Sequence, residues 1–105
     1  MIARIWHGYT SPENADDYEN LLKTRIFPYI EGKSVPGYRQ IELIKRPLEN
    51  EIEFITIMWF DSIEDIIKFA GADYETAVVL PDAKALLKRF DAKSQHYTVC
   101  ESLKY

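Results

Sequence analysis

The stretch from Glu51 to Ala70 constrains the fold of this 105-residue chain more than any other. Its first half, residues 52–60, is almost continuously apolar and rich in β-branched and aromatic residues, which is typical of a strand covered on both faces. At Asp61 and Ser62 the pattern changes to a helix cap, followed by apolar residues at helical spacing. The stretch therefore predicts a buried strand that leads directly into an amphipathic helix.

Length and composition indicate one domain over residues 1–105, because 47% of the residues are hydrophobic and 13% aromatic. The formal charge of −4 is spread without a basic stripe, which argues against a nucleic-acid partner. No apolar run approaches the roughly 20 residues that cross a bilayer, and the first residues lack a signal-peptide pattern. The single cysteine, Cys100, permits no internal disulfide. We therefore expect a cytoplasmic protein with no membrane partner.

The remaining elements follow from caps, breakers and hydrophobic spacing. Pro28 is expected to end or kink the first helix about a turn before it. A short turn or helix is expected within 73–80, stopped by Pro81, and a further helical piece from Asp82 to Phe90. The main elements are a strand over 2–9, a helix from Thr10 or Ser11, strands over 38–46 and 52–60, a helix from Asp61 and a strand over 94–103. This order predicts an α+β, ferredoxin-like split βαβ fold with helices on one face and strand order 4-1-3-2.

The other face of the predicted sheet needs its own cover. Both alternating sets of the third strand are apolar: Ile52, Phe54, Met58 and Phe60, or Ile55, Ile57 and Trp59. Helices can cover only one set, so we expect a second copy of the chain to cover the other. A charge at Ile55 or Met58, whichever faces the partner, should dissociate or unfold such a homodimer.

Strand directions suggest where a site would form. If the first and third strands run parallel and the second and fourth antiparallel to them, one edge of the sheet collects Trp6, His7, Tyr38, Arg39, Trp59, His96 and Tyr97. His7 and His96 are candidate catalytic bases, because imidazole titrates near neutral pH. The alternative for each is a strand-end histidine with a solvent or backbone partner.

Two tryptophans of this set, together with Tyr74, suggest a place for a flat substrate. Trp59, Tyr74 and Trp6 are candidate substrate-binding walls, although core packing is the commoner role of such residues. Arg39 is a candidate partner for a phenolate or carboxylate, or else a solvated arginine.

A separate expectation concerns Arg4, which lies inside the first strand. A buried arginine needs a carboxylate partner, for which the candidates are Glu53, Glu42 and Glu101.

Several short motifs resemble those of a known family. They are Ile-Trp-His-Gly at 5–8, Pro-Gly-Tyr at 36–38, Glu53-Phe54, Trp59-x-Asp61-Ser62, Phe69-Ala70-Gly71 and His96-Tyr97. Through them the whole chain resembles the antibiotic-biosynthesis-monooxygenase-like members of the dimeric α/β-barrel superfamily. The resemblance implies a homodimer whose two sheets close into a barrel, with a cavity between sheet and helices in each subunit.

The resemblance also implies a chemistry. Several members oxygenate aromatic or quinol-like small molecules without metal, flavin or haem, since an electron-rich phenolate or carbanion can pass an electron to O2 itself. The sequence has no glycine-rich phosphate loop, cysteine pair or His/carboxylate cluster, so we expect no cofactor and no metal. Haem-degrading relatives carry an Asn on the first strand and a Trp and a His on the second helix. Here His7 lies near the Asn position, and residues 66–80 contain neither Trp nor His.

A cofactor-independent monooxygenase is thus the first functional hypothesis. The alternatives are a non-catalytic ligand-binding or stress-associated protein of the same fold, and an isomerase or dehydratase on that fold.

Overall fold

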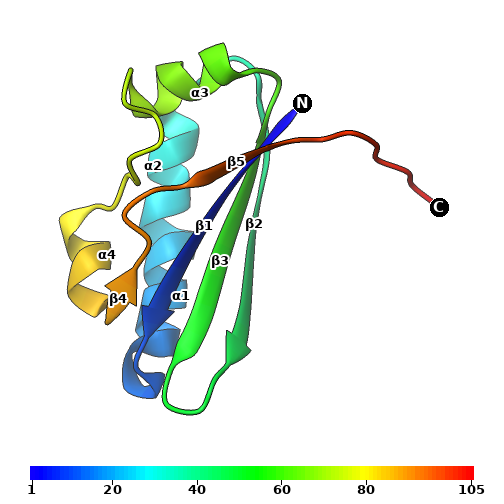
Figure 1. Ribbon diagram of the computed structural model, residues 1–105. Helices are drawn as coiled ribbons and strands as arrows, with labels where there is room; N and C mark the ends of the chain where they lie inside the picture. Colours follow the sequence, from blue (N-terminus) through cyan, green and yellow to red (C-terminus); the bar gives the residue numbers. More distant parts are fainter.

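A computed structural model describes all residues, 1–105, as one antiparallel sheet with its helices on one face (Figure 1). The strand order is β2-β3-β1, and both β4 and β5 pair with the far side of β1. The strands are β1 (Ile2–Thr10), β2 (Tyr38–Pro47), β3 (Ile52–Phe60), β4 (Arg89–Phe90) and β5 (Gln95–Thr98). The α+β, ferredoxin-like prediction is confirmed. The last strand is shorter than expected, since residues 99–105 lie outside the sheet.

The predicted strand directions were wrong. β1 and β3 run antiparallel, with Ile5 opposite Ile57, and β3 also runs antiparallel to β2. The crossover helix makes β1 and β2 parallel, and the short hairpin then returns β3 between them in the opposite direction. Trp59 consequently lies opposite Ala3, whereas His7 lies opposite Ile55. The single edge predicted to collect both tryptophans and both histidines does not form.

The first helical region runs without interruption through four short segments. They are η1 (Pro12–Asn14), α1 (Ala15–Leu21), the π-helical η2 (Leu22–Ile26) and α2 (Phe27–Gly32). Pro28 does not end the helix as expected. A proline ring clashes with the carbonyl four residues before it, and the wider π-helical turn before Pro28 provides space there.

The second helical region is interrupted. Helix α3 (Ile63–Ala70) is capped by Ser62, whose Oγ accepts a hydrogen bond from the Asp65 amide, and it ends at Gly71, where φ is 93°. Residues 73–80 form no helix, and of the two expected alternatives a short turn is present, at Tyr74 and Glu75. Pro81 begins α4 (Pro81–Leu86) instead of ending a helix, and Phe90 belongs to β4.

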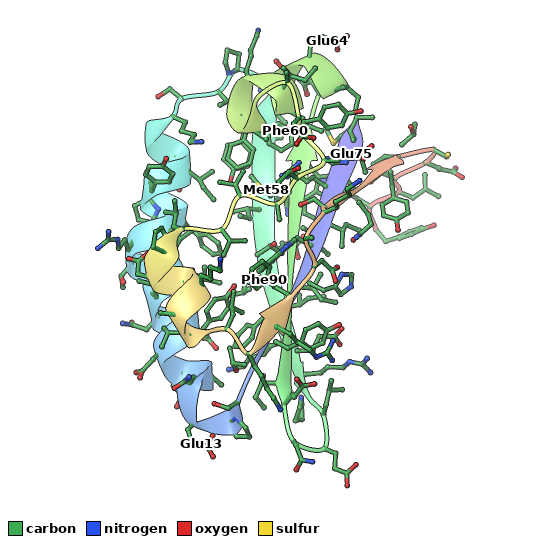
Figure 2. The ribbon with its side chains drawn as sticks, turned by 60° about the vertical axis from the view of Figure 1, so that its left-hand side comes forward. Glu13, Met58, Phe60, Glu64, Glu75 and Phe90 are labelled. Carbon is green, nitrogen blue, oxygen red and sulfur yellow. The ribbon has the colours of Figure 1, made fainter.

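The helix-facing side of the sheet carries two apolar clusters. Phe54 packs with residues of α1 and η2, and its ring lies 4.9 Å from that of Tyr18. Met58 and Phe60 pack against α3 (Figure 2). The set that contains Phe54, Met58 and Phe60 therefore faces the helices.

The opposite set on β3 faces away from every helix. Ile55, Ile57 and Trp59 are only half-buried, and Ile5 lies beside Ile57 on the same face. We call this side of the sheet, centred on these four residues, the open face. None of the helices is both long and apolar enough to cross a membrane.

Strand β2 forms one edge of the sheet and is mostly exposed. Its long charged side chains pair within the chain: Arg39 with Asp61, Lys45 with Glu19, and Arg46 with Glu53. Paired charges therefore lie near both ends of this edge strand.

Candidate functional site

A cavity lies between the sheet and the helices, as the family resemblance implied. Its walls are β1, β2 and β3 on one side and α1, η2, α2, α3 and α4 on the other, with residues 78–80 along its margin. Most of its lining side chains are apolar. Its free volume is about 70 Å3.

Trp6 contributes an indole ring to the cavity wall. Its Nε1 donates a hydrogen bond of 2.8 Å to the Asp91 carbonyl, which fixes the ring. The ring passes so close to Gly8 that a Cβ at this position would lie 2.7 Å from it. Gly8 is therefore required for the position of this wall.

Arg4 brings the one charged side chain into the cavity lining. Only 4% of this residue is exposed. Its Nη1 donates hydrogen bonds to the Tyr74 carbonyl at 2.6 Å and to His96 Nε2 at 2.8 Å. The guanidinium also lies 5.6 Å from the centre of the Phe69 ring. The expected carboxylate partner is absent, because neither hydrogen-bond acceptor carries a negative charge.

The three acids proposed for Arg4 lie elsewhere. Glu53 pairs with Arg46 and accepts from the Tyr9 hydroxyl. Glu42 accepts from Gln40 on β2. Glu101 is exposed in the C-terminal segment.

His96 and Tyr74 adjoin the cavity through Arg4. The two rings meet edge to face, with centroids 5.1 Å apart. Since His96 Nε2 accepts from a guanidinium, this nitrogen carries no proton, and the imidazole is neutral in the structure.

Burial sets the ionisation of both partners. Burial lowers the pKa of Arg4 to about 10, because the interior disfavours the charged form. Burial first, and then the positive charge of Arg4, lower the pKa of His96, while Glu75 raises it. The pair therefore combines a guanidinium cation with a neutral imidazole.

The lowered pKa of His96 predicts a pH dependence of stability. In the unfolded chain His96 binds a proton below about pH 6.5, whereas the folded chain resists it, so the free energy of unfolding should fall as pH decreases from 7.5 to 5.5. His96→Gln keeps an acceptor for Arg4 but does not titrate, so the fall should be smaller in this variant. Urea unfolding at both pH values measures it. Equal falls in the two proteins would contradict the assignment.

His7 and Trp59 lie on the open face, away from the cavity. His7 Nδ1 is 3.2 Å from Asp91 Oδ2, and both side chains are partly exposed. Across the β1–β3 pairing, Trp59 and His7 are four residues apart, or about 13 Å. Neither residue lines the cavity.

Arg39 lies at the surface. It forms two hydrogen bonds with Asp61, through Nε at 3.0 Å and through Nη2. These bonds raise the pKa of Arg39 and lower that of Asp61. The structure therefore brings Trp6, Tyr74 and His96 together around Arg4, and leaves His7, Trp59 and Arg39 apart from them.

Sequence reasoning did not identify Arg4, Thr56 or Ser94 as cavity residues. The position of Arg4 as an isolated charge in an apolar strand was a signal, and it was interpreted as an ion pair. The apolar strand 52–60 contains two polar residues, Glu53 and Thr56, and Thr56 is the one that lines the cavity. Ser94 carries no comparable signal.

No three His, Cys, Asp or Glu side chains lie close enough together to hold a metal ion. Neither a protein-family model nor a curated protein matches the sequence. Among solved structures, the chain is similar to a crystal structure of an MhuD variant with two manganese protoporphyrin IX molecules bound per active site. The two share 14% identity and a TM-score of 0.61 over 100% of both chains. This likeness establishes the ferredoxin-like fold.

Proposed function

We propose that the protein is a cofactor-independent monooxygenase that binds an aromatic or quinol-like small molecule in the cavity between sheet and helices. The observation that carries this proposal is the cavity itself: an apolar space with an indole wall and a buried guanidinium beside a neutral imidazole. Such a site removes an aromatic ring from water and stabilises negative charge on it.

The reaction can be written without a cofactor. A base removes one proton from a CH2 group next to an aromatic ketone, and the resulting carbanion transfers electrons to O2. A C–O bond forms, the peroxide takes up the proton, and O–O cleavage with loss of the second C–H proton gives a ketone and water. The substrate loses two hydrogens and gains one oxygen. One atom of O2 becomes the oxygen of the new ketone, and the other becomes the oxygen of water.

Of the two candidate bases, His96 suits this chemistry better than His7. His96 is on the cavity side of the sheet and is neutral, as a base must be, whereas His7 faces the other side. In the structure the Nε2 lone pair of His96 accepts from Arg4. Movement of Arg4 toward a substrate anion would release this lone pair for proton abstraction.

The proposal includes a homodimer formed through the open face. Ile5, Ile55, Ile57 and Trp59 leave this face apolar, and Ile44 on the neighbouring strand is 45% exposed. An apolar sheet face of this kind is commonly covered by a second copy through a two-fold axis.

A porphyrin ligand, as in the MhuD structure, fits these residues poorly. The cavity lining contains no His, Cys or Tyr other than Tyr18, whose pKa is strongly raised by burial. The nearby His96 uses its Nε2 for Arg4. The cavity therefore presents no free imidazole or thiolate to a haem iron.

Ligand entry requires the cavity to widen, because ligand pockets usually measure about 300 Å3 or more. The wall formed by Val78, Val79 and Leu80 is the part that can move most easily, since residues 77–80 belong to no helix or strand. Displacement of this segment would widen the cavity.

Oxygen uptake with anthrone and 1,4-dihydroxynaphthalene tests the proposed function. The wild-type protein, without added metal or flavin, should consume O2 faster than the spontaneous reaction. Thr56→Phe should reduce the enzymatic rate by about tenfold or more, because the larger ring occupies the cavity. Thr56→Val keeps the shape of the side chain and removes only its hydroxyl, so the rate should stay closer to the wild-type rate than in Thr56→Phe.

The outcomes separate the candidate functions. Binding that Thr56→Phe abolishes, without oxygen uptake, would reject the oxygenase and favour a ligand-binding protein or an isomerase. Oxygen uptake that Thr56→Phe leaves unchanged would show that this cavity is not the site.

A further inference from the structure

We propose that the cavity is built for ligands that carry an anionic oxygen, and that Arg4 is the residue that binds it. The ligand class is an aromatic carboxylate, or an aromatic phenol or enol that ionises when it binds. This inference rests on the cavity of the proposed function and is independent of whether oxygen reacts there.

Arg4 carries a buried positive charge with no negative charge beside it. Arg4 is 4% exposed, and no Asp or Glu oxygen lies within 4.0 Å of it. Burial of a charge without an opposite charge is costly, so such residues are usually paired or functional. The Tyr74 carbonyl and the His96 imidazole are neutral acceptors and do not balance it.

The guanidinium of Arg4 has hydrogen-bond donors that no protein atom uses. Both protein acceptors of Arg4 are bound by Nη1, and Nε and Nη2 donate to no protein atom. These two nitrogens form the side of the guanidinium that matches two oxygens of a carboxylate. Arg4 is itself part of the cavity lining, so a ligand in the cavity can reach it.

The surroundings of the Arg4 guanidinium are mostly apolar. The Phe69 ring lies on one side of the guanidinium, and Met58 and Trp6 line the same cavity. An apolar environment strengthens a bond between the guanidinium and an anion and excludes competing water. The site therefore selects a molecule with an apolar body and one anionic group.

Glu75, which follows Tyr74 in the chain, is the protein carboxylate that could serve as the counter-ion of Arg4 in place of a ligand. Its side chain is 56% exposed and lies 4.0 Å from Lys93 Nζ. If Glu75 were the hidden counter-ion of Arg4, its removal would destabilise the protein and leave ligand selectivity unchanged. Glu75→Gln therefore serves as a test of this alternative.

Three naphthalene derivatives of one shape test the proposal: 2-naphthoate, 2-naphthol and 2-methylnaphthalene. Binding is measured on the full chain by titration of the Trp6 indole NMR signal, which Trp59→Phe identifies. The wild-type protein should bind 2-naphthoate about tenfold or more tightly than 2-methylnaphthalene. In Arg4→Met this preference should disappear, while 2-methylnaphthalene binding stays within about threefold. Arg4→Lys should retain part of the preference, and Arg25→Met, at an exposed arginine paired with Asp82, should retain all of it.

The 2-naphthol arm distinguishes the two sources of the anion. Absorbance of naphtholate on binding near pH 7 would assign a phenol or enol that ionises in the site, and tight naphthoate binding with neutral naphthol would assign a carboxylate. Equal wild-type affinities for all three compounds would overturn the proposal. So would a Glu75→Gln variant that loses stability while Arg4→Met keeps its selectivity. If Arg4→Met does not fold, the wild-type preference and its partial retention in Arg4→Lys decide.

The two proposals fail in different ways. Selective binding of naphthoate without oxygen uptake would leave the anion site standing and reject the oxygenase. Oxygen uptake that is unchanged in Arg4→Met would support the oxygenase and reject the anion site.

Discussion

Ile55→Asp is expected to convert the proposed dimer into a monomer. Ile55 lies on the open face between His7 on β1 and Ile44 on β2, with no helix over it. Each carboxylate buried there against a second apolar sheet would cost about 3 kcal/mol or more, and the dimer would bury two of them, which is about ten-thousandfold in the dissociation constant. Sedimentation at micromolar concentrations should show half the wild-type mass, with the chain still folded by circular dichroism.

Two matched variants define this result. Met58→Asp places the same charge three residues later on the helix-facing side, where Met58 is 6% exposed, and it should unfold the chain. Ile67→Glu places a charge at a residue of α3 that is 38% exposed and off the open face, and the mass should not change. An unchanged mass in Ile55→Asp would contradict the role of the open face.

Phe60→Ala is expected to cause the largest loss of stability of any single truncation considered. Phe60 is completely buried, and its ring lies 5.4 Å from Tyr38 and 5.8 Å from Phe69. Truncation of a buried phenylalanine costs about 3–5 kcal/mol, because the cavity that remains is only partly filled by relaxation. For a domain whose total stability is about 5–15 kcal/mol, this loss leaves little margin. Urea unfolding measures it.

Comparison variants separate burial from aromatic character. Phe60→Leu keeps most of the volume and should cost less than half as much. Phe90→Ala removes a ring that is only partly buried beside Trp6, and its effect should also be smaller. A loss of less than about 1 kcal/mol in Phe60→Ala would show that the cluster around α3 repacks.

Helix caps and a tight connection made the fold predictable from the sequence. Ser62 and Gly71 marked both ends of α3, and the short connection between β2 and β3 required a hairpin. The predicted strand directions were wrong: the two central strands are antiparallel, because the crossover makes β1 and β2 parallel and the hairpin reverses β3. The π-helical turn before Pro28 was not predictable, since sequence spacing cannot distinguish a widened turn from a break.

The site was harder to predict than the fold. Both faces of β3 are apolar, so its sequence did not show that Trp59 faces away from the cavity. The partners of Arg4 are 70 and 92 residues away in the chain, beyond the reach of any local pattern. A buried arginine was expected to choose an acid, but Glu53 is held by Arg46 on the other face of the sheet.

The charged side chains on the edge strand β2 affect how the protein behaves at high concentration. A free strand edge can template growth by strands from other molecules, which leads to aggregation and fibrils. The ion pairs of Arg39, Lys45 and Arg46 hold three charged side chains along this edge. A strand added there would have to displace or desolvate these charges. The molecule can therefore present an apolar sheet face to one partner while its edge resists open-ended polymerisation.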